Sequence, residues 1–276
     1  KINKFLRLDG LSNLEILENF DPRWFDVRHL YKLTNLRKLK LVIEEKEEDE
    51  DDGKVEVLLN KLYVRLEGLV KESLVAFTEF LTTAQNRLRY SSIKVEGYKF
   101  CSEEDLTLLT QLFGCHRLDE LIIDGVIGKL PECNHFSQSL TKLTLDGSRL
   151  TEDPMATLEK LPNLWSLSLR SYAFVGEEMV CSPMGFPQLR SLRLWRLPNL
   201  EKWRVDEEAM PNLSHLVIHG CDNLKMVPDG LRFVTTLRKL EIRYMREVFT
   251  KRLRVVDGEE GEDFYKIRHV PSITFY

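Results

Sequence analysis

The sequence lacks several features that would place it in a common class of proteins. No apolar run approaches the roughly 20 residues that a membrane-spanning helix needs, and no signal peptide is present, so direct membrane insertion is not expected. No dense basic patch with interleaved aromatic residues occurs, so nucleic acid is not an expected partner. The five cysteines are odd in number and form no CxxC pair, which fits a reducing cytosol better than a disulfide framework.

Motifs that carry chemistry are also missing. There is no phosphate loop of the GxxxxGKS or GxxxxGKT kind, so no nucleotide site and no cofactor are expected in this chain. No Ser-His-Asp or Cys-His arrangement has supporting local sequence, which predicts no catalytic residue and no enzyme activity. His215 and His219 are four residues apart, but on a strand they would be separated by about 13 Å, so no metal site is expected.

A hydrophobic pattern written three times is the strongest feature that is present. FPQLRSLRL (186–194), MPNLSHLVI (210–218) and VTTLRKLEI (234–242) each place apolar residues at spacings of three, three and two, and successive copies lie 24 residues apart. The last two apolar positions alternate with polar ones, as on a β-strand with one buried face. One copy cannot bury its apolar side alone, whereas stacked copies can pair their strands in parallel.

The same pattern recurs less regularly along the chain, with copies that begin at Leu11, Leu30, Leu112, Leu140 and Leu158. Equivalent leucines, separated by 22, 24, 25, 24 and 24 residues, are Leu121, Leu143, Leu167, Leu192, Leu216 and Leu240. These intervals are typical of leucine-rich repeats. The fold class predicted is therefore an α/β repeat solenoid: a curved leucine-rich-repeat horseshoe with a parallel β-sheet on its concave face and mostly loops or short helices on its convex face.

One region departs from the repeat. It begins with an acidic run of eight acids and one lysine, EEKEEDEDD (44–52), which is expected to be solvated because like charges repel. Apolar residues then follow at helical spacing over 55–62 and 69–80, which predicts an oversized repeat with helix on its outer face over about 55–89. The strand pattern returns near Ile93 and Val95.

The domain organisation follows from these segments. We expect a single leucine-rich-repeat domain over residues 1–276, with a C-terminal cap over about 255–276 in which the alternating segment VPSITF (270–275) forms a final strand. Ile273 and Phe275 would close the stack of inward side chains. Because the first residues already follow the repeat pattern, we expect this chain to be a fragment of a larger protein.

Three segments carry a resemblance to a known family. The stretch from GFPQLRSLRL to VTTLRKLEI (185–242) and the tail GEDFYKIRHVPSITFY (261–276) resemble the C-terminal repeats of plant intracellular immune receptors of the coiled-coil, nucleotide-binding, leucine-rich-repeat type. LSNLEILENF (11–20) is similar to early repeats of the same family, particularly its downy-mildew-resistance group. The most specific pieces are GCDNLKMVPDGL (220–231) and GEDFYKIRHVPS (261–272), which a generic leucine-rich repeat does not require.

The resemblance implies a function that the repeat pattern alone does not. Members of this family detect pathogen effectors in the cytoplasm, either directly or through a guarded host protein. Their repeat domain contributes recognition and holds the receptor inactive against its nucleotide-binding module. On activation such receptors exchange ADP for ATP, assemble, in some cases at the plasma membrane, and trigger localised cell death. Of these functions, only those of the repeat domain, recognition and restraint, would belong to this chain.

Strand phase predicts which residues face a partner. If Leu192 and Leu194 point inward, Arg193 and Trp195 point outward. The same offset gives an outer column of Val42, Glu96, Asp124, Asp146, Arg170, Trp195, His219 and Arg243, which changes from acidic to basic and aromatic. The column before it is Lys40, Lys94, Ile122, Thr144, Ser168, Arg193, Val217 and Glu241.

Two candidate functional sites follow from these columns and from the acidic run. Tryptophan surrounded by arginines is typical of protein-binding hot spots, so a partner-binding cluster is predicted at Arg170, Arg193, Trp195, Arg196, His219 and Arg243. The alternative is an ordinary solvated face in which Trp195 packs sideways on Trp203 or Arg170. The second candidate is an autoinhibitory latch to the nucleotide-binding module, against the alternative of an unpaired loop, at Glu44, Glu45, Glu47, Glu48, Asp49, Glu50, Asp51 and Asp52.

Other functions remain open for a leucine-rich-repeat chain of this kind. A substrate adaptor of a ubiquitin ligase uses intracellular repeats, but it is expected to carry an F-box segment upstream of them. A stand-alone scaffold, such as a phosphatase or GTPase regulator, usually shows more regular repeats and no tail like GEDFYKIRHVPS. Upstream sequence would separate these classes, because a phosphate loop favours the receptor and an F-box favours the adaptor.

Overall fold

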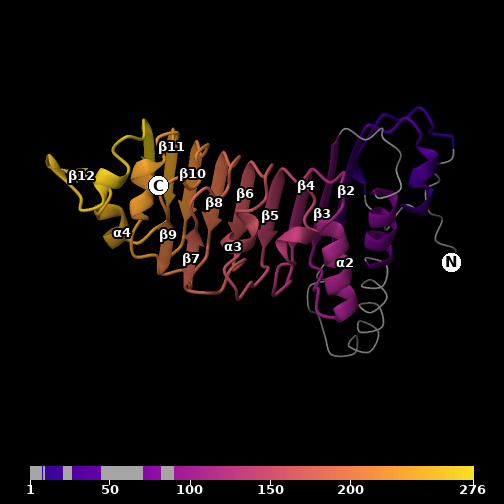
Figure 1. The fold of residues 1–276 in the computed structure, drawn as a ribbon, viewed down its shortest axis with the longest axis horizontal. Coiled ribbons are helices and arrows are strands. Elements are labelled where there is room, and N and C mark those ends of the chain that lie inside the picture. Colours follow the sequence, from indigo (N-terminus) through magenta and orange to yellow (C-terminus); the bar gives the residue numbers. More distant parts are fainter. Residues whose placement is uncertain (1–7, 9, 21–26, 45–70, 82–89) are drawn as a thin grey trace, which may run out of the picture.

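The computed structural model describes residues 8, 10–20, 27–44, 71–81 and 90–276. Its main element is a sheet of ten parallel strands in the order β1-β2-β3-β4-β5-β6-β8-β10-β11-β14, and the strands stand side by side along the long axis of the molecule (Figure 1). The strands are β1 Ile16–Phe20, β2 Lys38–Glu44, β3 Tyr90–Glu96, β4 Glu120–Asp124, β5 Lys142–Asp146, β6 Ser166–Arg170, β8 Ser191–Trp195, β10 His215–His219, β11 Lys239–Arg243 and β14 Ser272–Phe275. This arrangement confirms the predicted leucine-rich-repeat solenoid.

The leucines that define the repeat form the inner ladder of the sheet. Leu121, Leu143, Leu167, Leu192, Leu216 and Leu240 are successive register partners. None of the six side chains is more than 1% exposed, and full burial of a leucine stabilises the fold by about 1.5–3 kcal/mol. Ile273 and Phe275 of β14 continue the ladder opposite Leu240 and Ile242, which confirms the predicted final strand.

The register between β2 and β3 corrects one part of the predicted columns. The sequence pattern placed Val42 opposite Glu96, whereas in the structure Val42 lies opposite Lys94 and Glu44 lies opposite Glu96. The shift of two residues arises because Leu41 and Ile43, rather than Leu39 and Leu41, are the register partners of Ile93 and Val95. A two-residue shift keeps the same side chains on the same face, so the predicted inward and outward assignment is unaffected.

The outer face carries short helices, as expected for short repeats. They are η1 Val27–Lys32, η2 Cys133–His135, α3 Met155–Leu158 and η3 Asp229–Phe233. Residues 71–81 are helical, in agreement with part of the predicted helix, and the predicted helical segment 55–62 lies outside the described residues. None of the helices in the described part of the chain has the length and hydropathy to cross a membrane.

One longer helix, α2 (Glu103–Phe113), was not predicted from the sequence. It begins at a capping box in which the Asp105 backbone N–H donates to Ser102 Oγ and the Ser102 N–H donates to Asp105 Oδ2. Tyr98 Oη also donates to this carboxylate over 2.7 Å. Burial would raise the pKa of Asp105, but the hydrogen bonds from Ser102 and Tyr98 prevail and lower it to about 2. The capping box was the available sequence signal for this helix.

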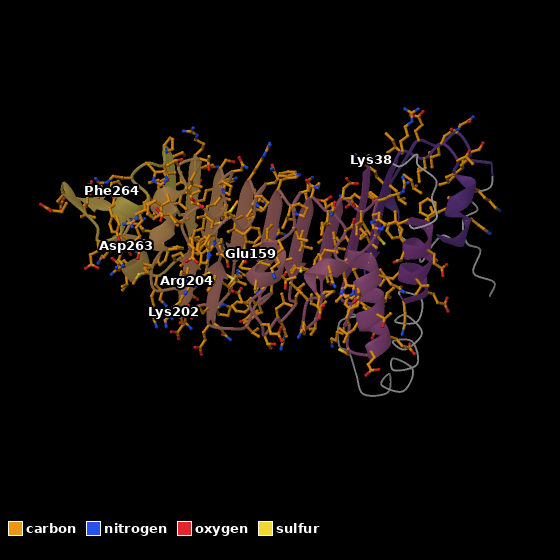
Figure 2. The ribbon with its side chains drawn as sticks, in the orientation of Figure 1. Lys38, Glu159, Lys202, Arg204, Asp263 and Phe264 are labelled. Atoms are coloured by element: carbon orange, nitrogen blue, oxygen red, sulfur yellow. The ribbon has the colours of Figure 1, made fainter. Side chains whose placement is uncertain are left out.

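Two of the later repeats carry extended rather than helical outer segments. Strands β7 (Glu178–Cys181) and β9 (Lys202–Val205) form a separate two-stranded parallel sheet along the lower edge in Figure 1. The buried carboxylate of Glu159, which is labelled in Figure 2, accepts a hydrogen bond from the Ser182 N–H. Asp153 likewise accepts from the Val180 N–H. These bonds attach the outer strand β7 to the α3 segment of the preceding repeat.

A ladder of polar side chains links successive repeats just before their strands. In each case a side-chain amide donates to a backbone carbonyl in the preceding repeat: Asn35 to Ser12, Asn163 to Gln138, Asn199 to Val175 and Asn212 to Pro187. In the following repeat Thr236 Oγ1 takes this position and donates to Pro211 O. These bonds satisfy carbonyl groups of the tight turns that strand pairing does not reach.

The C-terminal cap is fixed by a buried ion cluster. The segment between β11 and β14, which leads into and includes this cap, contains α4 (Glu247–Lys251), β12 (Val255–Val256), β13 (Glu259–Glu260) and η4 (Phe264–Lys266). Lys266 Nζ is 2.7 Å from Asp229 Oδ1 and 2.8 Å from Asp263 Oδ1, and Asp263 (Figure 2) also binds Arg252. Burial opposes both charges, but the pKa of Asp263 is lowered by hydrogen bonds from Arg252 and Lys266, and the pKa of Lys266 is raised by those with the two aspartates.

Candidate functional site

The candidate site lies on the solvent-facing side of the sheet, which we call the exposed sheet face. On β8, Leu192 and Leu194 are fully buried, Arg193 is exposed and Trp195 is half-buried. The predicted strand phase is therefore confirmed at this strand. Arg170, Trp195, His219 and Arg243 are consecutive register partners on β6, β8, β10 and β11, so the structure brings the predicted column together.

Aromatic side chains stack across three repeats of this face. The rings of Trp195 and His219 are parallel within 6° with centroids 3.7 Å apart, and His219 also contacts Tyr244 with centroids 4.9 Å apart. His219 is consequently only 5% exposed, although the sequence predicted an outward, accessible residue. The predicted alternative was packing of Trp195 on Trp203 or Arg170; in the structure its ring stacks on His219, with Arg170 as its register partner on the other side. Trp203 lies instead in β9, where it is buried.

A buried carboxylate organises the cations around this stack. Glu241 is 4% exposed, and its two carboxylate oxygens contact Lys239, His215 and Arg243. Hydrogen bonding to Lys239, opposed by burial and assisted by His215 and Arg243, lowers the pKa of Glu241 to about 2. The Arg243 guanidinium also lies 4.3 Å from the centre of the Tyr276 ring. Sequence reasoning placed Glu241 in an outward column but missed this role, although cations at i−2 and i+2 on a strand were a usable signal.

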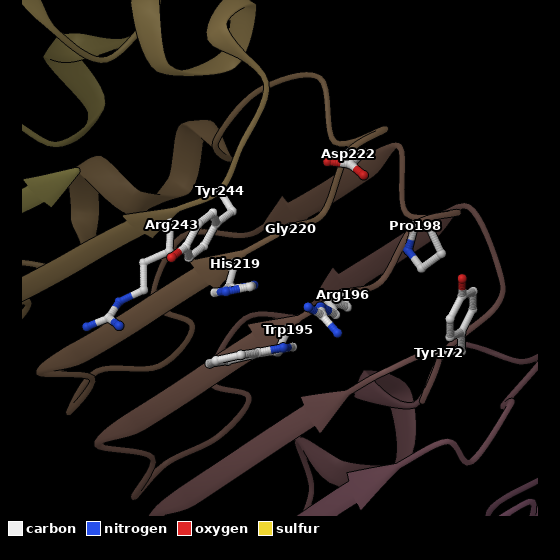
Figure 3. Close-up of a pocket in the computed structure, with 9 residues that line it drawn as sticks. All are labelled: Tyr172, Trp195, Arg196, Pro198, His219, Gly220, Asp222, Arg243 and Tyr244. Carbon is white, nitrogen blue, oxygen red and sulfur yellow. The ribbon is translucent and has the colours of Figure 1, made fainter. Parts of the chain in front are cut away.

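A pocket of about 760 Å³ opens where these strands end (Figure 3). We call it the rim pocket, and its lining residues are Tyr172, Trp195, Arg196, Pro198, His219, Gly220, Asp222, Arg243 and Tyr244. Four residues of the predicted cluster, Trp195, Arg196, His219 and Arg243, belong to this lining. Arg193 and Arg170 do not. Sequence reasoning missed Tyr172, Asp222 and Tyr244, because they lie in the turns after the strands and have no place in the strand columns.

Several turns that follow described strands begin with a residue in the left-handed backbone conformation. Gly97, Gly147 and Gly220 follow their strands with φ between 56° and 79°. At the rim pocket the equivalent positions carry side chains: Arg196 has φ 50° and Tyr244 has φ 49°. A residue with a Cβ is disfavoured there by about 1–2 kcal/mol relative to its ordinary conformations. The pocket therefore displays two large side chains at positions where other repeats use glycine.

An acidic half adjoins this basic and aromatic half of the sheet face. Asp124 and Asp146 are register partners on β4 and β5, and Asp146 lies opposite Arg170 on β6. The predicted change of charge along the column is therefore confirmed between β5 and β6. Glu44, predicted as the start of the acidic segment, is the last residue of β2 and lies opposite Glu96. The other seven acids of that segment, within 45–52, lie outside the described residues.

Metal and thiol chemistry have little support in the described ranges. No group of three or more His, Cys, Asp or Glu side chains there could hold a metal ion. All five cysteines are free: Cys115, Cys181 and Cys221 are buried, and Cys101 and Cys133 are exposed. Burial raises the pKa of Cys115 and Cys181 to about 12 and that of Cys221 to about 11. These three thiols are therefore packing residues rather than nucleophiles.

Comparison with known proteins agrees with the fold. A family model described as "Leucine-rich repeat region" matches residues 1–254. Probable disease resistance RPP8-like protein 2 of Arabidopsis thaliana is 34% identical over 270 residues, which cover 98% of this chain and 26% of that protein. Disease resistance protein RPP8 of the same plant is 32% identical over 276 residues, with 98% and 26% covered. Disease resistance protein RPH8A is 42% identical over 158 residues, with 57% and 17% covered.

The matches cover nearly all of this chain but a smaller share of the relatives. The chain spans about a quarter of the length of the two Arabidopsis relatives that match nearly all of it. Among solved structures, an internalin from Listeria monocytogenes matches 91% of this chain and 71% of its own, with 13% identity and a TM-score of 0.36.

Proposed function

This chain belongs to the leucine-rich repeat family, and on that premise we propose that it is the recognition and restraining domain of a plant disease-resistance receptor. Its relatives over nearly the whole chain are named disease resistance proteins. In this proposal the domain acts in the cytoplasm and binds a protein, either a pathogen effector or a guarded host protein. The full receptor would bind ADP or ATP in a module outside this chain.

The observation that carries the recognition role is the register of Arg170, Trp195, His219 and Arg243 across four neighbouring strands. Arginine and tryptophan supply contact area and forked hydrogen bonds, and they are enriched at the centres of protein interfaces. Arg193 stands exposed on the same strand as Trp195, so it adds a cation in reach of the same partner. A rigid sheet presents these side chains without the entropy cost of ordering a loop.

Capture of a partner from infected plant tissue tests this role. The domain should retain a pathogen or host protein that the Trp195→Ala, Arg193→Ala double variant loses. Because Trp195 stacks on His219, its removal also lowers stability, so Arg193→Glu serves as a second variant on an exposed side chain. Lys129→Glu is the matched control, since Lys129 is exposed, follows β4 rather than a strand of the cluster, and among the described residues pairs with Glu152 alone. Equal capture by the wild type and by folded Arg193→Glu and double variants contradicts the proposal.

The restraining role rests on charge. The acidic segment that begins at Glu44 carries eight acids and one lysine, and a basic surface of the nucleotide-binding module would be its partner in the resting receptor. Replacing the eight acids by their amides in the full receptor should then raise signalling without a pathogen. Cell death measured after transient expression in leaves is the readout, and unchanged basal activity at equal protein level contradicts the latch.

A further inference from the structure

One of the two arginines that line the rim pocket, Arg196, is not paired with another side chain in the described part of the chain. Arg243 is bound by Glu241 through Nε and Nη2. Arg196 is exposed, and within the described part of the chain no ion pair or hydrogen bond engages its guanidinium. Its stem runs beside Gly220, where an added Cβ would lie 3.4 Å from Arg196 Cγ. The guanidinium of Arg196 is therefore placed at the pocket with its donors free for a ligand.

The charged side chains of the pocket lining are the guanidinium groups of Arg196 and Arg243 and the carboxylate of Asp222. Burial lowers the pKa of His219, and the charges of Arg196 and Arg243 lower it further, so both guanidinium groups act at the centre of the pocket. A neutral His219 is the form that stacks there at neutral pH. Asp222 is the one acid of the lining, and it is exposed. An anionic group is thus the ligand that the charges favour.

Aromatic walls flank that cation. Trp195 is covered on one face by His219, and no described ring or cation stacks on its other face. Tyr172 and Tyr244 are 54% and 70% exposed and lie on opposite sides of Trp195 and Arg196 in Figure 3. Such rings lose little entropy on binding and prefer planar or apolar partners. The left-handed turns at Tyr172 (φ 65°), Arg196 and Tyr244 hold these side chains at the rim, at the expense of backbone strain.

We propose that the rim pocket binds a short acidic and aromatic segment of a partner protein, with a carboxylate on Arg196 and a neighbouring planar side chain on Trp195. The assignment rests on the proposed function and specifies the chemistry of the partner. A carboxylate matches the fork of a guanidinium through two parallel hydrogen bonds, and an aromatic neighbour fills the space between Trp195 and Tyr172. The site lies at the ends of the strands, where the exposed sheet face (Trp195, His219 and Arg243) meets the turns that carry Tyr172, Arg196 and Tyr244.

Titration with two matched peptides tests the assignment. The probes are acetylated and amidated tetrapeptides, Glu-Tyr-Glu-Tyr and its amide analogue Gln-Tyr-Gln-Tyr. Binding is followed by NMR through the indole N–H of Trp195, assigned with Trp195→Phe. We expect the acidic peptide to bind at least tenfold more tightly than the analogue at low salt, and Arg196→Gly to remove at least nine-tenths of that affinity. Inorganic phosphate at the same concentration should not displace the peptide.

The matched control is Arg149→Gly. Arg149 is also an exposed arginine in a left-handed turn (φ 52°), but it does not line the pocket. Glycine is favoured at both positions, so neither variant should melt below the wild type, and only Arg196→Gly should lose binding. Equal affinity for the two peptides, unchanged binding by Arg196→Gly, or displacement by phosphate overturns the assignment. If the peptide fails while capture from tissue still depends on Arg193, the proposed function stands and the rim pocket assignment alone is wrong.

Discussion

Each side chain on the exposed sheet face is surrounded by the same position of the repeats before and after it. Trp195 and Tyr244 contact His219, which is 5% exposed, whereas Arg193 lies between Ser168 and Val217 and remains exposed. The direction of a side chain follows from strand phase, but its accessibility follows from the size of its neighbours. His219 therefore acts as a support for Trp195, and the surface offered to a partner is formed by the residues on either side of it.

Glu241 should make stability depend on pH at the acidic end. Its pKa lies below the unfolded value of 4.5, at about 2, so its contribution is complete above pH 4.5 and is lost as the pH falls through about 2. Glu241→Gln should lower the free energy of unfolding by about 1–3 kcal/mol at neutral pH. Urea unfolding of both proteins should show this difference shrinking between pH 4.5 and 2. A difference that is independent of pH would contradict the role of the charge.

Thiol reactivity should divide the cysteines into two groups. A maleimide added to the native protein should modify Cys101 and Cys133 and leave the three buried thiols unmodified, because burial removes both access and thiolate. Intact-mass measurement should therefore give two adducts before denaturation and five after it. A third adduct on the native protein, in the absence of unfolding, would show that one of the buried positions opens.

At the scale of elements, the sequence was most informative where a side chain enters the shared core. The spacing of the leucines from Leu121 to Leu240 correctly predicted which residues are register partners on neighbouring strands, since burial of one face fixes the register of a strand. The outer segments β7 and β9 were not predicted, because a segment there can be extended or helical as long as it buries a few residues such as Met179 and Val205. The bridging asparagines also escaped the pattern, since they lie in turns.

The candidate site was likewise predicted where its residues lie on strands and not where they lie in turns. Strand phase gave the column from Arg170 to Arg243, and with it three residues of the rim pocket: Trp195, His219 and Arg243. The fourth predicted residue, Arg196, follows Trp195 in the sequence and has no place in the strand columns. Strand phase did not give Tyr172 or Tyr244, because the direction of a turn residue depends on a left-handed backbone that no strand periodicity encodes. It also did not give the burial of His219, which requires the position of a ring one repeat away.

The short helix η3 should tolerate no side chain at Gly230. An alanine Cβ there would lie 1.9 Å from the carbonyl oxygen of Val205, so η3 and β9 would have to separate. Gly230→Ala should lower the free energy of unfolding by about 3 kcal/mol, as overpacking does in a rigid core. Gly128→Ala is the control: its φ is +67° and nothing lies within 4 Å, so only the backbone cost of about 1 kcal/mol applies. Equal effects in urea unfolding would contradict the close approach.

The ion cluster of the cap should contribute more to the free energy of unfolding than an exposed ion pair does. Lys266 and Asp263 are 2% and 4% exposed, so Lys266→Met leaves a buried carboxylate with less compensation and should cost about 3 kcal/mol. Lys129→Met, which breaks a pair that is 67% and 68% exposed, should cost less than about 1 kcal/mol. Hydrogen exchange should localise the first loss to η4 and β14. Uniform loss of protection across the sheet would show that the cap is not a separate unit.

For the whole molecule, the two segments that the sequence predicted to be most specific to the family, 220–231 and 261–272, contact each other. Lys266, in the tail, bonds to Val227 O and Asp229 in the turn, and Tyr265 Oη donates to Asp229. His269 Nε2 lies 3.0 Å from Val234 O in the same way. A solenoid repeat normally contacts only its neighbours. Because η3 precedes β11 and η4 precedes β14, this contact joins the last repeat to its neighbour and closes the end of the stack.

The reversal of charge between β5 and β6 gives the sheet face an electric dipole across its strands. Asp124 and Asp146 form the negative pole and Arg170 and Arg193 the positive one, separated by strand spacings of about 4.8 Å. An approaching protein with the opposite polarity is rotated into its docking orientation before any atoms touch, which raises the association rate constant. With the captured partner, stopped-flow mixing should show association slowing with added salt and with Asp146→Arg, while dissociation changes little. The order of repeats along the solenoid would then set the speed of detection as well as its specificity.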